Sequence, residues 1–204
     1  MVCCHYPWWY LCSNWIGHYH GDSPCYFQMA KSEEEMSVKA DKWIAQWIVG
    51  DPDDPDINPA SLDLHLGGHM VMRKPVPDRS MAVLETEWDR PNGQQILLEP
   101  GAQWLLCTEP VYVHVAQAGL FTLKSSLGRR GLFLAHPGWI DPGYQGAITF
   151  SVSVQVPVVM TVGERVGQLI YFDMDKIPRK PYGEVGHYQH STGVTKERQD
   201  GQDE

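Results

Sequence analysis

The chain has a deficit of positive charge and no long apolar run. Of its 204 residues, 16 are Lys or Arg and 25 are Asp or Glu, so the formal net charge is −9. Because affinity for a polyanion comes mainly from clustered Lys and Arg, this charge argues against a general nucleic-acid binder. No apolar run approaches the roughly 20 residues of a membrane helix, and the N-terminus lacks a signal peptide's basic and apolar segments. These absences predict a cytoplasmic protein that binds neither nucleic acid nor membrane.

Cysteines are scarce outside the first residues. Only Cys107 belongs to the main body of the chain. The others, with nearby histidines, are Cys3, Cys4, Cys12, Cys25, His5, His18 and His20. A zinc site there is conceivable, but the spacing fits no zinc-finger pattern. We expect residues 1–35 to be an N-terminal extension, which an upstream start codon would explain, with the working protein beginning near Met36.

Two nucleotide-handling signatures are also missing. Zinc-dependent deaminases carry H-x-E followed by P-C-x-x-C, and neither pattern occurs here. The phosphate loop G-x-x-x-x-G-K-[ST] is absent as well. His65 and His69 lie four residues apart, but their segment has the pattern of a strand and turn, so they need not share a face. We expect both histidines to be structural, and we expect no protein-bound metal centre.

From Met36 onward the pattern is regular. Apolar residues between Ser37 and Val49 recur at three- and four-residue spacings, which predicts an amphipathic helix. Gly50 and the Asp/Pro run 51–56 end it in a solvated loop. Short segments rich in Val, Leu, Ile, Thr and Phe then alternate with Gly/Pro turns, at 97–98, 104–107, 111–115, 132–135, 147–154, 156–162 and 166–172. Strands this short and frequent predict a mainly β barrel or sandwich, and the polar residues 196–204 predict a disordered tail.

Two neighbouring motifs carry the chemistry. The first, Lys124-Ser125-Ser126-Leu127-Gly128-Arg129, places hydroxyls and cations beside a glycine, as phosphate binding requires. The second, Gly138-Trp139-Ile140-Asp141-Pro142-Gly143-Tyr144-Gln145-Gly146, sets one carboxylate in a turn next to an aromatic ring that could cover a sugar or base. Together they indicate a site for a phosphorylated nucleoside.

These motifs belong to an ordered series that resembles the dCTP deaminase and dUTPase superfamily. The others are Asp56 to Gly67, Glu99 to Glu109, Gly163 to Leu169 and Pro181 to Gly193. The resemblance spans a domain of residues 36–195. It implies a distorted β-barrel or jelly roll, the dUTPase-like β-clip, with a short N-terminal helix. It also implies a homotrimer with sites between subunits and a pyrimidine deoxynucleoside triphosphate as the small-molecule partner.

The resemblance also implies roles for single residues. Ser125, Ser126 and Arg129, with Lys124 nearby, would bind triphosphate oxygens, and Gln168 would lie near the phosphates. Asp141 would bind the sugar 3′-hydroxyl and orient or activate the attacking water, which suits a carboxylate. Tyr144 would pack on the deoxyribose and leave no room for a 2′-hydroxyl. Tyr182 belongs to the C-terminal segment that would close over the nucleotide.

One expected residue is missing. dCTP deaminases carry a proton-shuttling glutamate on the strand after the Gly-Tyr-x-Gly turn, in the pattern Ile-Thr-Leu-Glu. Here the strand reads Ile148-Thr149-Phe150-Ser151, so Ser151 stands at the glutamate's position. A serine hydroxyl is not a base near neutral pH without activation, and loss of such a group costs roughly 10²–10⁴-fold in rate. This difference counts against deamination more than against nucleotide binding.

Three functions therefore remain open. The first is a hydrolase that splits a pyrimidine dNTP, of the dUTP or dCTP type, into monophosphate and pyrophosphate, with Mg²⁺ on the triphosphate. The second is a dCTP deaminase that uses another base. The third is a nucleotide-binding member of the family without catalysis.

Overall fold

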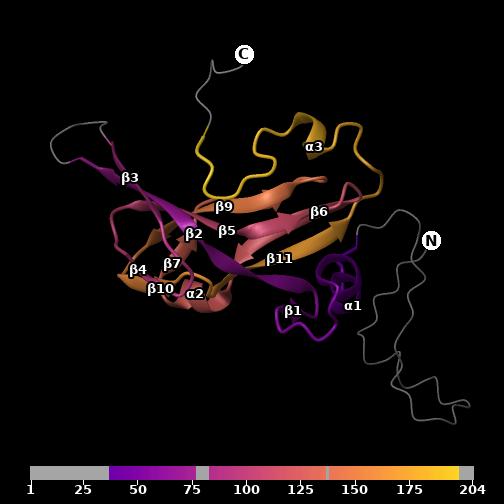
Figure 1. The fold of residues 1–204 in the computed structure, drawn as a ribbon, viewed down its shortest axis with the longest axis horizontal. Helices are drawn as coiled ribbons and strands as arrows, with labels where there is room; N and C mark the ends of the chain where they lie inside the picture. Colours follow the sequence, from indigo (N-terminus) through magenta and orange to yellow (C-terminus); the bar gives the residue numbers. More distant parts are fainter. Residues whose placement is uncertain (1–36, 77–82, 137, 198–204) are drawn as a thin grey trace, which may run out of the picture. The chain divides into compact units, whose positions relative to one another are not determined.

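The computed structural model describes residues 37–76, 83–136 and 138–197 (Figure 1). The expected extension 1–35 and the tail beyond residue 197 lie outside the described residues. Lys196 and Glu197, the first two residues of the expected tail, are described, and both form ion pairs with side chains of the sheet.

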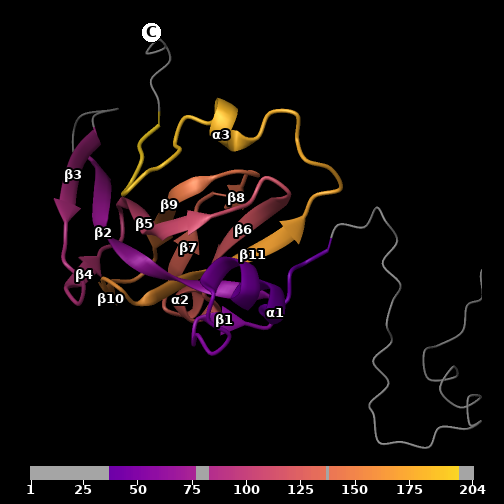
Figure 2. The same ribbon diagram turned by 45° about the vertical axis from the view of Figure 1, so that its right-hand side comes forward.

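The described residues fold mainly into antiparallel strands. In chain order the strands are β1 (Ile57–Asn58), β2 (Ser61–Pro75), β3 (Val83–Asp89), β4 (Gln95–Leu98), β5 (Gln103–Tyr112), β6 (Gln117–Leu123), β7 (Leu132–Leu134), β8 (Trp139–Ile140), β9 (Gln145–Val154), β10 (Val158–Thr161) and β11 (Arg165–Asp173). One curled sheet has the order β7-β9-β5-β2-β11-β6-β8, with β1 and β3 also paired to β2 (Figure 2). A separate pair joins β10 to β4. The prediction of a mainly β fold is confirmed.

Strand β2 makes the sheet curl. Its first part pairs with β11, whereas its second part pairs with β5 and β3. The change of partner falls at Gly67 and Gly68, where the register with β5 shifts between Leu66 and Met70. A Cβ at Gly67 would come within 2.6 Å of the Cys107 sulfur, and a Cβ at Gly68 within 2.1 Å of a backbone oxygen. Glycine is therefore required where the strands approach this closely.

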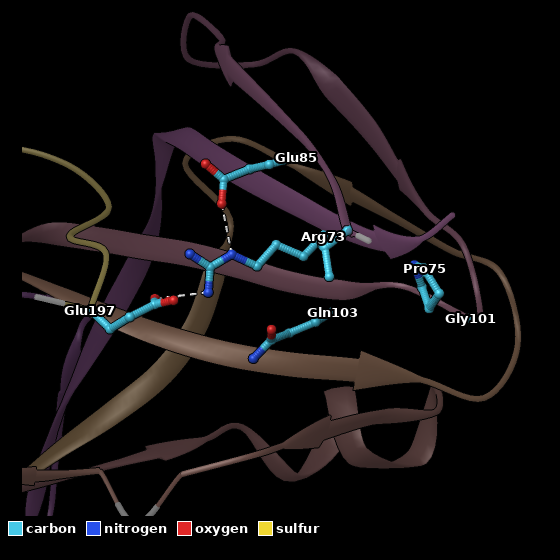
Figure 3. Close-up of a pocket in the computed structure, with 7 residues that line it drawn as sticks. Arg73, Pro75, Glu85, Gly101, Gln103 and Glu197 are labelled. Atoms are coloured by element: carbon cyan, nitrogen blue, oxygen red, sulfur yellow. Dashed lines mark hydrogen bonds and ion pairs between the residues drawn. The ribbon is translucent and has the colours of Figure 1, made fainter. Parts of the chain in front are cut away.

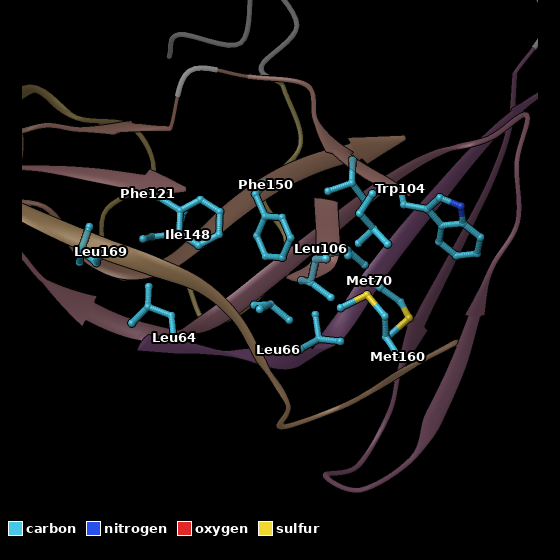
Figure 4. Packing of buried hydrophobic residues seen from close by; sticks show 14 of the residues in the cluster. Leu64, Leu66, Met70, Trp104, Leu106, Phe121, Ile148, Phe150, Met160 and Leu169 are labelled. Carbon is cyan, nitrogen blue, oxygen red and sulfur yellow. The ribbon is translucent and has the colours of Figure 1, made fainter. Parts of the chain in front are cut away.

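The core lies inside the curl, and β9 shows how the sequence specifies it. Side chains alternate between the two faces of a strand, and Ile148, Phe150, Val152 and Val154 all belong to the buried core. The Phe150 ring packs 5.0 Å from that of Phe121 on β6, centroid to centroid, and leucines and methionines of neighbouring strands surround them (Figure 4). The opposite face of β9 carries Ala147, Thr149, Ser151 and Ser153.

The N-terminal helix is shorter than the sequence predicts. Helix α1 covers Asp41–Ile44 and continues as a wider π-turn, η2, over Ala45–Val49. Residues 37–40 are extended instead, because Val38 bridges to Phe172 and the Lys39 amide donates to the carbonyl of Tyr171. The helical prediction from residue 37 is thus wrong for its first turn, where pairing with β11 replaces the helical hydrogen bonds. The end at Gly50 is confirmed, with φ +83°.

Two further short helices complete the described chain, α2 (Ser125–Arg129) and α3 (Tyr182–Val185). The predicted strands at 97–98, 104–107, 147–154 and 166–172 all fall within observed ones. The predicted strand 111–115 extends too far, since β5 ends at Tyr112. Among the described residues, no helix has the length and apolar character needed to cross a membrane.

Candidate functional site

The predicted phosphate motif forms a tight turn at the end of β6. Helix α2 is anchored by Leu127, which is buried, while Ser125, Ser126 and Arg129 are exposed. The Arg129 guanidinium donates to the Ser125 hydroxyl oxygen over 3.1 Å. Two hydroxyls and one guanidinium therefore lie together on the open side of the turn. This set can donate several hydrogen bonds to a phosphate group.

Lys124, just before the helix, is held differently. Its ammonium group forms an ion pair with Asp63 of β2, whose side chain is only 4% exposed. The other carboxylate oxygen of Asp63 accepts from the amide nitrogens of Asn58 at 2.8 Å and Gln168 at 3.2 Å. Burial alone would raise the pKa of Asp63, but the bonds from Lys124, Asn58 and Gln168 outweigh it and lower that pKa. Lys124 and Gln168, both predicted near the phosphates, therefore converge on one buried carboxylate.

Around this cluster lies a second set of charged groups. Arg165 forms an ion pair with Asp56, and its Nε lies 3.6 Å from Asp63. His65 lies between two carboxylates, with Nε2 3.5 Å from Asp56 and Nδ1 3.3 Å from Glu109. Among the described residues, no group of three His, Cys, Asp or Glu side chains is arranged to hold a metal ion.

The predicted catalytic carboxylate lies in the turn between β8 and β9. Asp141 is exposed, and one of its oxygens accepts from the Trp139 indole nitrogen at 3.2 Å. Gly143 has φ +87°, which lets its amide donate to the Val113 carbonyl at 3.0 Å and close the turn. The turn thus presents Asp141 to solvent with one donor fixing its orientation. A solvent-facing carboxylate in that state can accept a hydroxyl or water proton.

Tyr144 lies beneath the same turn. It is buried, at 8% exposure, and its hydroxyl donates to the Ala147 carbonyl at 2.6 Å. Burial raises the pKa of this phenol. The ring meets that of Tyr182 edge-on, with centroids 5.3 Å apart. Tyr144 and Tyr182, both predicted to contact the nucleotide, are thus in contact with each other.

The C-terminal segment joins these residues to the edge of β9. The Ser191 hydroxyl lies 3.0 Å from the Tyr144 hydroxyl, and the Ser191 carbonyl accepts from the Ala147 amide at 2.8 Å. Farther along, the Val194 amide donates to Nδ1 of His69 at 2.8 Å, while Nε2 of that ring contacts Glu87 at 2.7 Å. Nδ1 of His69 therefore accepts from the segment, while Nε2 of the same ring contacts Glu87 of β3.

Ser151 lies on the face of β9 that this segment crosses. It is 7% exposed, and its hydroxyl oxygen accepts from the Gln103 amide nitrogen at 2.9 Å. Gln103 also lines a pocket of about 600 Å³ in which Arg73 binds Glu85 and Glu197, at 2.7 and 2.8 Å (Figure 3). Ser151, which the sequence resemblance predicts at the position of the deaminase glutamate, is therefore a neutral hydroxyl paired with a neutral amide.

Sequence reasoning assigned no role to Asp63, Asn58 or Gln103. Asp63 lies within the motif Asp56 to Gly67, but two of its partners, Lys124 and Gln168, are 61 and 105 residues away in the chain. For Asp63 and Gln103, the sequence shows only a polar residue between two apolar neighbours. That signal does not identify the partner.

The comparisons with known proteins agree with this architecture. A family model described as dCTP deaminase-like matches residues 32–174. The dCTP deaminase, dUMP-forming, of Sulfurihydrogenibium sp. (strain YO3AOP1) is 32% identical over 155 residues, which cover 72% of this chain and 84% of that protein. The dCTP deaminase of Halorubrum lacusprofundi is 34% identical over 143 residues, covering 64% and 70%.

A solved structure shares the fold. The crystal structure of 2′-deoxycytidine 5′-triphosphate deaminase from Agrobacterium tumefaciens superposes with a TM-score of 0.55 at 23% identity, over 68% of this chain and 48% of that one. The class is therefore a curled antiparallel β fold of the dCTP deaminase type. The chain belongs to the dCTP deaminase-like family, whose place is in pyrimidine deoxynucleotide metabolism.

Proposed function

We propose that this protein hydrolyses a pyrimidine deoxynucleoside triphosphate, of the dUTP or dCTP type, to the monophosphate and pyrophosphate without deaminating the base. The observation that carries the proposal is the contrast between Asp141, exposed and available, and Ser151, buried and paired with Gln103. Hydrolysis needs one carboxylate beside the sugar and an anion-binding turn. Deamination needs a further proton-shuttling group at the base.

In the proposed reaction each group acts through its own chemistry. Ser125, Ser126 and Arg129 bind the triphosphate oxygens, and Asp141 accepts hydrogen bonds from the sugar 3′-hydroxyl and the attacking water. Asp141 takes a proton as water oxygen bonds to the α-phosphorus. The bond from that phosphorus to the bridging oxygen breaks, and pyrophosphate leaves with the bond's electron pair. Tyr144 supports the sugar from below, and Tyr182 belongs to the segment that covers it.

Magnesium fits this site as an ion that arrives on the triphosphate. Mg²⁺ is usually held by phosphate oxygens with one or two carboxylates and several waters. The exposed Asp141 carboxylate offers at most one such ligand, and the described residues provide no cluster of three. When bound, the ion would neutralise charge on the phosphates. The homotrimer with shared sites, the closed barrel and the cytoplasmic location belong to the same proposal.

One assay separates the functions. The purified protein is incubated with Mg²⁺ and dCTP, dUTP or dTTP in turn, and the products are resolved by chromatography. Monophosphate with pyrophosphate, and an unchanged base, is the expected result. Binding without turnover would favour the non-catalytic family member instead.

Deamination is the second candidate, and the names of the relatives favour it. Those similar proteins are called dCTP deaminases, several of them dUMP-forming. Formation of dUTP or dUMP from dCTP by the natural chain would support this candidate and require a base other than residue 151. In the Ser151→Glu variant, a gain of deamination absent from the natural chain would support the alignment of Ser151 with the missing glutamate.

A further inference from the structure

Asp63 is the most heavily coordinated carboxylate of the site described above. It is almost fully buried, yet it is charged, because Lys124, Asn58 and Gln168 all direct polar hydrogens at its two oxygens. Because an unpaired buried charge is strongly destabilising, a buried carboxylate such as Asp63 needs partners in fixed positions. Its pKa is lowered accordingly. The question is what this arrangement does for the neighbouring turn.

The sheet brings these partners together by register. Asp63 on β2 stands opposite Gln168 on β11, and Gln168 stands opposite Thr122 on β6. Lys124 follows two residues after Thr122, at the point where β6 ends and α2 begins. Three adjacent strands therefore deliver the carboxylate, the amide and the ammonium group to one place. The strand pairing, and not the local sequence, sets their separation.

Lys124 is also the first fixed point of the anion-binding turn. Its backbone amide donates to the Val166 carbonyl at 3.0 Å, and its carbonyl accepts from the Leu127 amide at 2.9 Å. Its backbone is extended, with φ −60° and ψ 137°, while Ser125 begins the helix. No side chain of the described residues caps the start of α2. The ion pair to Asp63 is thus the side-chain tie that holds the entrance of the turn.

We infer that Asp63 is a positioning residue for phosphate binding, and that it acts through Lys124. The inference rests on the proposed function, because it concerns the same turn. Asp63 itself contacts no phosphate, since its oxygens are occupied and a carboxylate would repel an anion. It holds Lys124 against the sheet, so that Ser125, Ser126 and Arg129 keep the spacing that the triphosphate needs. Asn58 and Gln168 orient the carboxylate for that task.

The test measures binding instead of turnover. Affinity for α,β-imido-dUTP with Mg²⁺, a substrate analogue that resists cleavage at the α,β position, is measured by isothermal titration calorimetry on the full chain. Asp63→Asn keeps the shape of the side chain and removes its charge. We expect the dissociation constant to rise about 10-fold, the lower end of what a charge-assisted hydrogen bond contributes. The far-UV circular dichroism should remain unchanged.

A matched control separates positioning from general stability. Asp173 at the far end of β11 forms a comparable ion pair with Lys39 at 2.6 Å. Asp173→Asn should lower the melting temperature while leaving the dissociation constant within about twofold, since an ion pair's loss alone affects stability. A double-mutant cycle then tests the route: in a Lys124→Met background, Asp63→Asn should change affinity by less than about twofold.

Each outcome decides something. If the natural chain binds the analogue and Asp63→Asn binds it equally well, the inference is wrong while the proposed function stands. A tenfold rise of the dissociation constant on Asp63→Asn in the Lys124→Met background also overturns the inference.

If Asp63→Asn fails to fold, Asn58→Ala provides a second test. This variant keeps the ion pair between Asp63 and Lys124 and removes the 2.8 Å hydrogen bond from the Asn58 amide, so binding should weaken about threefold. Unchanged affinity in Asn58→Ala overturns the inference. If the natural chain binds none of the analogue, the proposed function and the inference fall together.

Discussion

Two parts of the described chain, a charged end at α2 and a neutral end at β9, differ in their electrostatics. Near α2, Lys124, Asp63 and Arg165 form a cluster of charges packed against the sheet. In the middle of β9, the buried Ser151 hydroxyl accepts from the amide of Gln103, whose side chain is exposed, so this pair is neutral. The first end presents cations and hydroxyls that can donate to an anion, whereas the second lacks an ionisable group at the position where the sequence resemblance predicts the deaminase glutamate. The proposal of hydrolysis without deamination rests on this difference.

The largest effect is expected from the only carboxylate assigned to the chemistry. Asp141→Asn should reduce hydrolysis of the triphosphate by about 10²–10⁴-fold, because an amide cannot accept the proton of the attacking water. Steady-state kinetics with pyrophosphate detection measures this. Asp175→Asn, which changes an exposed aspartate that accepts from the Lys176 amide, is the control and should leave the rate unaltered. An unchanged rate in Asp141→Asn would remove Asp141 from the mechanism.

The next effect tests the charged end. Arg129→Met should raise the KM for the triphosphate by about 10–150-fold, since hydrogen bonds to a charged group contribute about 1.5–3 kcal/mol each. Arg130→Met is matched in chemistry and position. Arg130 instead contacts the Val159 carbonyl and Glu164, so its loss should leave KM within about twofold. Equal effects of the two substitutions would mean that the turn attracts the nucleotide only through its net charge.

A smaller effect is expected on the pH dependence of the free energy of unfolding in acid. The folded-state pKa of Asp63 lies below its ordinary value of 3.8. Its stabilising contribution is therefore complete above that value and is lost as the pH falls through the folded-state pKa. In chemical denaturation across pH 2–7, the free energy of unfolding of Asp63→Asn should fall less steeply in acid than that of the natural chain. Glu85→Gln serves as the comparison, because Glu85 also has a lowered pKa, held by Lys196 and Arg73 on the exposed rim.

The smallest effect belongs to the neutral end. Ser151→Ala should leave hydrolysis within about twofold, because the hydroxyl takes no proton in the proposed reaction. It removes the hydrogen bond from the exposed Gln103 amide, which costs roughly 0.5–1.5 kcal/mol of stability because water can replace the acceptor. Thermal melts measure the loss of stability, and steady-state kinetics measure the hydrolysis rate. A loss of activity beyond tenfold at a temperature well below the melt would give Ser151 a catalytic role.

Local patterns in the sequence predicted much of the fold. The short segments rich in Val, Leu, Ile, Thr and Phe between Gly/Pro turns were sufficient to locate strands such as β9, because strand propensity and turn residues act locally. The start of the first helix was not predictable, since the pairing of Val38 with Phe172 spans most of the domain. The motif also predicted the exposed set on α2. The partners of Lys124 and Ser151 depend on strand register across 61 and 48 residues, which no local pattern specifies.

The most direct test of the central claim is a single incubation with dCTP and, in parallel, dUTP, in which pyrophosphate and ammonia are both quantified. The account predicts pyrophosphate release from at least one of the two substrates, stoichiometric with monophosphate, and no ammonia from dCTP. Ammonia in amounts equal to the dCTP consumed would contradict it, because deamination would then proceed with Ser151 where the glutamate was expected.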